Sequence, residues 1–139
     1  MIGFKTDLIT KRIMGQDYIW ILECPLIYEN EKYRITVFDG FDFDFASIPT
    51  LLRGIIPKNG AKYDRASCLH DAMYASQIFR KEECDLIFLE AMLSDGTNSF
   101  LAKLMYEAVT IGGEKAYNDC YDIAKYRDLI KVEVLNGNS

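Results

Sequence analysis

The chain has 139 residues, of which 50% are apolar, and this suits one compact domain over residues 1–139 with a sizeable core. Its net charge of −5 argues against the basic surface that nucleic-acid binding needs. The N-terminal segment has no apolar run of signal-peptide length, and no stretch is apolar enough to span a bilayer. We therefore expect a soluble protein, without nucleic acid as a partner.

The cysteines are widely spaced and form no C-x-x-C pair. Without a secretion signal, we expect free thiols rather than disulfides. The four positions are Cys24, Cys68, Cys84 and Cys120.

The first part of the chain favours short strands. Aromatic and β-branched residues predict strands near 2–4 and over 17–22, 26–28 and 33–38. Pro25 and a polar turn over 29–32 separate them. We expect these strands to form a small antiparallel meander in a β-rich region that extends to residue 49.

Residues 40–49, Gly-Phe-Asp-Phe-Asp-Phe-Ala-Ser-Ile-Pro, alternate aromatic and acidic side chains. In a strand, the three phenylalanines share one face, and Asp42 and Asp44 share the other. Two neighbouring carboxylates repel each other unless solvent or a cation intervenes, and calcium takes such oxygen ligands. A cation site and a plain solvated face both fit this pattern.

Residues 50–61 contain two glycines and a proline and are predicted to be a loop. Beyond them, helical periodicity predicts helices over 62–79, 81–93, 99–111 and 114–130, with Asn98 capping the third and a loose tail over 131–139. The sequence thus predicts an α+β fold, in which a small N-terminal antiparallel β-sheet is followed by a bundle of three to four α-helices.

The first predicted helix carries the only histidine of the chain, His70, followed by Asp71 and, one turn on, by Tyr74. On the next helix, Asp85 could accept a hydrogen bond from one imidazole nitrogen and leave the other as a general base. Tyr74 would support Asp85, and Asp71 would hold a metal ion together with Asp42 or Asp44. Such a site would activate water against an ester or amide.

Two alternatives remain open at this point. The same residues fit a polar contact between two helices that has no catalytic role, and the spacing alone favours this simpler interpretation. A serine nucleophile beside His70, either Ser47 or Ser67, also fits, although there is no G-x-S-x-G motif. A single histidine argues against a zinc site built from several imidazoles.

Residues 37–113 resemble a family of phage and prophage proteins catalogued as domain of unknown function number 1353. The resemblance rests on blocks in the same order: 40–49, Tyr63 with Ala66, 70–74, 84–88, 91–92, 104–106, 108–109 and 112–113. It implies a phage or prophage origin, with the host cytoplasm or the virion as location, and it implies no activity.

The pattern His70-Asp71-x-x-Tyr74 followed by Asp85 also resembles the active-site helix pair of phospholipase A2, especially the short, disulfide-poor forms. This resemblance implies that His70 activates water, that Asp71 binds calcium, and that Asp85 and Tyr74 orient His70. The glycine-rich calcium loop and the disulfides of that class are missing here, and Asp42 and Asp44 are the candidate replacements for the loop.

The sequence therefore leads to two functional hypotheses. In the first, the chain is a phage-encoded hydrolase that uses a bound cation to cleave an ester or amide of a lipid or of the cell envelope. In the second, it is a non-enzymatic virion or tail component, or a host-interaction protein, and the His-Asp-Tyr cluster is a structural brace.

Overall fold

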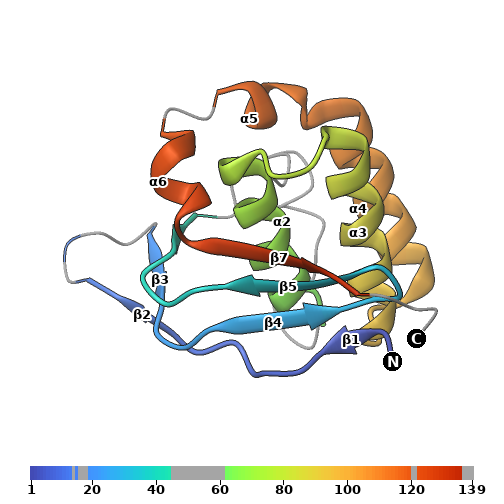
Figure 1. The fold of residues 1–139 in the computed structure, drawn as a ribbon. Coiled ribbons are helices and arrows are strands. Elements are labelled where there is room, and N and C mark those ends of the chain that lie inside the picture. Colours follow the sequence, from blue (N-terminus) through green and yellow to red (C-terminus); the bar gives the residue numbers. More distant parts are fainter. Residues whose placement is uncertain (14, 16–18, 45–61, 120–121, 136–139) are drawn as a thin grey trace.

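The computed structural model describes residues 1–13, 15, 19–44, 62–119 and 122–135 (Figure 1). Its larger sheet is antiparallel, with the strand order β1-β4-β5-β7. The central hairpin is stabilised at its turn by Asn30, whose side chain accepts hydrogen bonds from the backbone of Lys32 and Tyr33. The four strands are β1 (Gly3–Phe4), β4 (Leu26–Glu29), β5 (Tyr33–Val37) and β7 (Ile130–Val134).

A smaller antiparallel sheet stands beside the first, with the strand order β2-β3-β6. Its members are β2 (Thr10–Arg12), β3 (Trp20–Leu22) and β6 (Asp42–Phe43). Leu22 and Phe43 are buried, so this sheet contributes to the same core as the larger one.

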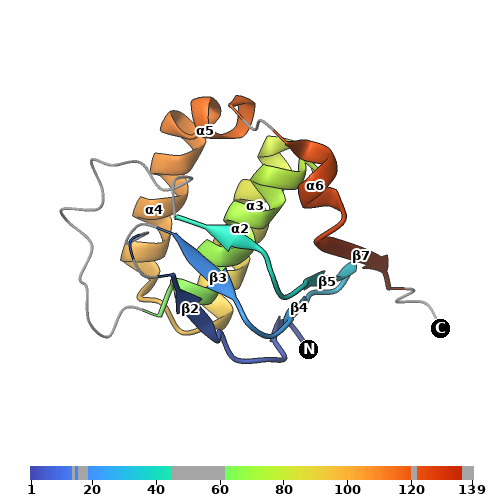
Figure 2. The same cartoon turned by 90° about the vertical axis from the view of Figure 1, so that its left-hand side faces the viewer.

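The helices lie together on one side of the four-stranded sheet (Figure 2). The helix α2 ends at Gln77, which has a left-handed backbone conformation (φ 48°) and donates its N–H to the carbonyls of Met73 and Tyr74. In α4, the Asn98 side chain accepts from the first free backbone N–H groups, as predicted. The helices in the described ranges are α2 (Asp64–Ser76), α3 (Lys81–Ser94), α4 (Ser99–Gly112), α5 (Glu114–Asn118) and α6 (Ile123–Arg127).

Polar contacts attach the helices to the sheet at defined points. The Tyr28 hydroxyl of β4 donates to Glu90 of α3 at 2.6 Å. The Arg65 guanidinium of α2 forms two bonds to Asp95 and a third to the backbone carbonyl of Thr6. These contacts fix α2 and α3 relative to the strands, and the two helices carry the candidate site.

The structure confirms the predicted α+β class, and α3 and α4 begin at the predicted residues. It differs in two places. The predicted meander is divided between two sheets, because β4 pairs with β1 and β5, whereas β3 pairs with β2 and β6. Residues 40–44 form only the short strand β6, and residues 45–61, which include the predicted loop and Ser47, lie outside the described ranges.

The C-terminal part also differs from the prediction. The expected helix over 114–130 is replaced by the short helices α5 and α6, and the expected tail contributes β7 to the sheet. Asp122 accepts a hydrogen bond from the backbone N–H of Lys125 and so starts α6 anew. Ile130-Lys-Val-Glu-Val alternates with the period of a strand, and it pairs with β5 along its whole length.

None of the described helices is both long enough and apolar enough to cross a bilayer.

Candidate active site

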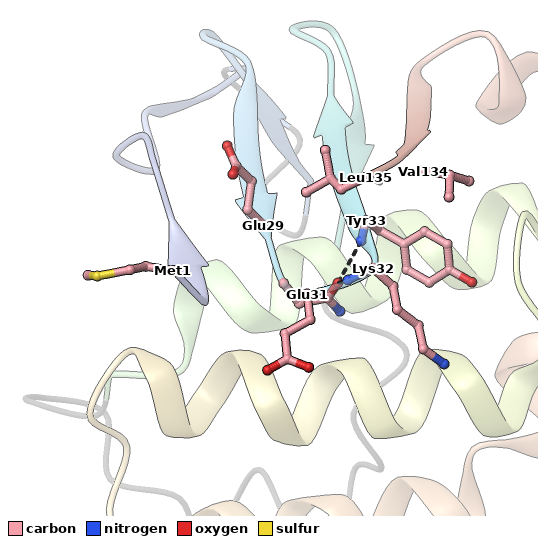
Figure 3. A pocket seen from close by; sticks show the side chains of 8 residues that line it. Met1, Glu29, Glu31, Lys32, Tyr33, Val134 and Leu135 are labelled. Atoms are coloured by element: carbon pink, nitrogen blue, oxygen red, sulfur yellow. Dashed lines mark hydrogen bonds between the residues drawn. The ribbon is translucent and has the colours of Figure 1, made fainter. Parts of the chain in front are cut away.

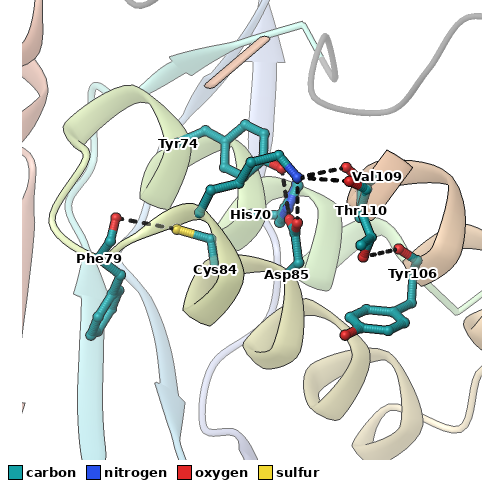
Figure 4. Close-up of polar contacts among 9 residues, drawn as sticks. His70, Tyr74, Phe79, Cys84, Asp85, Tyr106, Val109 and Thr110 are labelled. Carbon is teal, nitrogen blue, oxygen red and sulfur yellow. Dashed lines mark hydrogen bonds and ion pairs between the residues drawn. The ribbon is translucent and has the colours of Figure 1, made fainter. Parts of the chain in front are cut away.

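The candidate site lies where α2 packs against α3 (Figure 4). His70 Nε2 is 2.8 Å from Asp85 Oδ1, and the Tyr74 hydroxyl donates to the same oxygen at 2.6 Å. Since His70 and Tyr74 are four residues apart on one helix, a single turn carries both to one carboxylate. The structure thus brings together the three residues predicted to be catalytic.

A fourth side chain, Lys81, completes what we call the Asp85 network (His70, Tyr74, Lys81 and Asp85). Lys81 Nζ is 2.7 Å from Asp85 Oδ2 and donates to the Val109 carbonyl at 2.9 Å (Figure 4). Val109 is in the last turn of α4, where carbonyl groups attract a cation. Lys81 therefore joins the start of α3 to the end of α4 and balances the charge of Asp85.

The Asp85 network is almost completely enclosed. The side chains of His70, Asp85 and Lys81 are 0%, 3% and 15% exposed. The imidazole ring lies between two aromatic rings, with centroids 4.1 Å from Tyr74 and 4.5 Å from Phe88. Low solvent content strengthens each polar contact here and makes any loss of a partner costly.

Burial and the neighbouring charges set the protonation of the network. Burial lowers the pKa of His70 below 6.5; Asp85 acts in the opposite direction without overcoming burial, and Lys81 lowers the pKa further. Burial alone would raise the pKa of Asp85, but hydrogen bonds from His70, Lys81 and Tyr74 outweigh it and hold the pKa below 3.8. Burial, with Asp85 beside it, raises the pKa of Tyr74 well above 10.

These directions determine which imidazole nitrogen carries the proton. A carboxylate can only accept hydrogen bonds, so the contact between Nε2 and Asp85 requires a proton on Nε2. Because burial keeps His70 neutral, Nδ1 is then the nitrogen with the lone pair. In this tautomer Nε2 donates to Asp85, and Nδ1 can only accept a hydrogen bond.

The side chains predicted to bind metal do not converge in the same way. Asp42 accepts hydrogen bonds from Lys125 Nζ at 3.3 Å and from the Tyr126 hydroxyl at 3.1 Å, so α6 supplies the cation that this strand face needs. Asp44 is exposed, whereas Asp71 is 8% exposed and belongs to the buried part of α2. Within the described ranges, no three acidic, histidine or cysteine side chains are grouped as a metal site.

Gly113, at the junction between α4 and α5, lies against the Tyr74 hydroxyl of the network. A β-carbon at this position would lie 2.5 Å from the Val109 carbonyl oxygen and 2.8 Å from the Tyr74 hydroxyl. Only glycine therefore lets the junction between α4 and α5 approach Tyr74 so closely.

Ser67, the second serine considered as a nucleophile, is one turn before His70 on α2. It is fully buried, and its hydroxyl has no hydrogen-bond partner in the described part of the chain. The hydroxyl is not hydrogen-bonded to His70, so the structure does not show the contact that would activate it.

A separate, open pocket lies at the turn between β4 and β5 (Figure 3). Its lining mixes both signs of charge with apolar groups, and it includes no member of the Asp85 network. The lining residues are Met1, Glu29, Asn30, Glu31, Lys32, Tyr33, Val134 and Leu135. We assign the candidate chemistry to the network and not to this pocket.

The fold and the site define an α+β domain in which two packed helices enclose a histidine–aspartate pair. A family model described as "Protein of unknown function (DUF1353)" matches residues 20–109, and the chain belongs to this family. No curated protein and no solved structure gives a significant match to the chain. The matched segment contains α2, α3 and every member of the Asp85 network.

Sequence reasoning did not single out Lys81 and Gly113. Lys81 is four residues before Asp85, a spacing at which helical side chains form ion pairs, so a local signal for it exists. Gly113 enters the sequence analysis only as part of the family resemblance, because its approach to Tyr74 depends on how the helices pack in the folded chain.

Proposed function

We propose that this protein is a hydrolase in which His70 is the general base, oriented by Asp85, and in which Tyr74 supports Asp85. The observation that carries the proposal is the convergence of His70 Nε2 and the Tyr74 hydroxyl on one oxygen of Asp85. This contact fixes the ring and its tautomer, and a base needs both before it can deprotonate a water molecule.

The mechanism that we propose uses only residues of this chain. Hydrolysis requires that water and the substrate carbonyl reach Nδ1 of the buried His70. The water then gives a proton to His70 as its oxygen attacks the carbonyl carbon of an ester or amide, and the bond from that carbon to the leaving group breaks. The imidazolium that forms is stabilised by the Asp85 carboxylate at 2.8 Å, and it then returns the proton to the leaving group. Lys81 holds Asp85 in place and limits the basicity of His70.

We propose a lipid or cell-envelope ester or amide as substrate. We also propose that the chain is of phage or prophage origin and acts in the host cytoplasm or in the virion. Asp71 is the proposed calcium ligand. The described residues do not group three possible ligands around Asp71, and Asp42, its predicted partner, contacts Lys125 and Tyr126 instead. No step of the proposed mechanism therefore uses calcium. Calorimetry with calcium, on the wild type and on Asp71→Asn, tests this part separately.

The decisive variant is His70→Gln, because a glutamine amide can still donate to Asp85 but has no basic nitrogen. We expect the rate of hydrolysis of phospholipid and acyl-ester substrates to fall by about 10²- to 10⁴-fold, which is the usual contribution of a general base. Lys115→Gln, which removes a charge on the exposed side of α5, is the control that should retain full activity.

A second candidate function rests on the complete burial of His70. In this alternative, the chain is a non-enzymatic virion, tail or host-interaction protein, and the Asp85 network is a brace between α2, α3 and α4. It predicts no hydrolysis by the wild type, and it predicts that His70→Gln, which keeps the bond to Asp85, leaves partner binding unchanged. A wild-type rate equal to that of His70→Gln on every substrate would favour the brace.

A further inference from the structure

The strand β7 is at the edge of the four-stranded sheet. It pairs with β5 along one side, and it stands last in the strand order (Figure 2). Within the described ranges, no backbone hydrogen bond connects its other side to another segment. An edge of five residues offers a row of backbone donors and acceptors to another strand.

Two hydrogen bonds determine which backbone groups point outward. The Leu135 N–H donates to the Lys32 carbonyl at 2.7 Å, and the Phe38 N–H donates to the Leu129 carbonyl at 2.9 Å. Antiparallel pairs alternate between bonded and non-bonded residues, so positions 129, 131, 133 and 135 face β5. The backbone groups of Ile130, Val132 and Val134 therefore face outward.

We propose that β7 pairs antiparallel with β7 of a second copy of this chain, so that the two four-stranded sheets become one. The two-fold axis passes beside Val132, which then faces Val132 of the second copy. In this register the outward groups of Ile130 face those of Val134 of the second copy, so every outward N–H and C=O of the strand finds a partner.

Charge selects this register among those that the hydrogen-bond pattern allows. With the axis beside Val132, each Lys131 lies opposite Glu133 of the second copy. An axis beside Lys131 or beside Glu133 would place like charges directly opposite each other, which is unfavourable. Both side chains project from the sheet face away from the helices and are partly exposed, at 58% and 36%.

Apolar contact supports the same arrangement. Val134 is 79% exposed, although it is on the side of the strand that carries buried Ile130. In the proposed register it lies opposite Ile130 of the second copy, so pairing covers it.

The experiment is sedimentation equilibrium over a range of protein concentrations, on the wild type, Lys131→Glu and Glu133→Lys. We expect the wild type to form dimers, and each charge reversal to raise the dissociation constant about tenfold or more, because each places like charges opposite each other twice. An equimolar mixture of the two variants should form dimers again, since every facing pair in the mixed dimer has opposite charges. Lys115→Glu, at an exposed position of α5, is the control and should behave as the wild type.

Three results would overturn the proposal. The first is a monomer mass for the wild type at every concentration up to about 1 mM. The second is a wild-type dimer that neither charge reversal weakens. The third is an equimolar mixture of the two variants that stays monomeric although both variants melt like the wild type. Amide hydrogen exchange provides a second readout: the Val132 and Val134 amides should gain protection as concentration rises, and those of Lys131 and Glu133, which face β5, should not change.

Discussion

At the scale of single residues, the most unusual feature is a neutral histidine between two aromatic rings beside an ionised aspartate. Burial keeps the imidazole neutral, and three donors keep the carboxylate charged. The Asp85 carboxylate would not stay ionised without its partners in such an enclosed place, since an unpaired buried charge costs several kcal/mol. His70, Asp85 and Lys81 therefore depend on one another.

The lowered pKa of His70 predicts how stability depends on pH. Above pH 6.5 the imidazole is neutral in the folded and in the unfolded chain; below it, the unfolded chain binds a proton that the folded chain does not. The free energy of unfolding should therefore fall as the pH drops from 6.5 toward about 5, by at most about 1.4 kcal/mol per pH unit.

Urea denaturation at a series of pH values measures this dependence. His70 is the only histidine, so His70→Gln should largely remove the slope in this interval. A wild-type stability that is constant or rises as the pH falls through the interval would contradict the lowered pKa.

At the scale of secondary-structure elements, the site depends on the close approach of the end of α4 to α2. Gly113 permits the contact with Tyr74, and Lys81 reaches the last carbonyls of α4. Three helices are thus fixed around one carboxylate.

Gly113→Ala tests this packing. The added methyl group would lie closer than van der Waals contact to the Val109 carbonyl and the Tyr74 hydroxyl, and we expect a loss of about 1–3 kcal/mol in the free energy of unfolding. In a Tyr74→Phe background the same substitution should cost less, because the hydroxyl that it meets is gone. Equal costs in the two backgrounds, measured by denaturation of all four proteins, would show that Tyr74 does not contact this position.

The sequence predicted much at this scale. The apolar period of α3 and α4, and the cap at Asn98, are local signals, and the structure has both helices where these signals place them. His70, Tyr74 and Asp85 could be paired from their spacing on two successive helices. Lys125 beside Asp42 could not be predicted, because the two residues are 83 positions apart and meet only in the folded chain.

At the scale of the whole molecule, the last described strand joins the ends of the chain into one sheet. The strand β7 pairs with β5 although about a hundred residues separate them, and Ile130 enters the core. A pattern of five alternating residues near the end of a chain gives little sign of such a distant pairing, and for this reason the sequence suggested a loose tail.

Two substitutions by alanine test whether β7 is part of the core. Ile130→Ala removes a side chain that is 6% exposed and should cost about 2–4 kcal/mol of stability, whereas Val134→Ala, at 79% exposed, should cost less than about 0.5 kcal/mol in the monomer. Chemical denaturation at low protein concentration provides both values. If Ile130→Ala cost no more than Val134→Ala, β7 would not be part of the core.

The central claim is that Asp85 holds His70 as the neutral tautomer with its proton on Nε2 and its lone pair on Nδ1. Nitrogen-15 NMR of the imidazole tests it directly, because the single histidine gives one set of ring signals. We predict a protonated Nε2 and an unprotonated Nδ1 at pH 7, with a pKa below 6.5 that rises in Lys81→Met but not in Lys115→Met. A doubly protonated ring at pH 7, or a proton on Nδ1 instead of Nε2, would contradict the account.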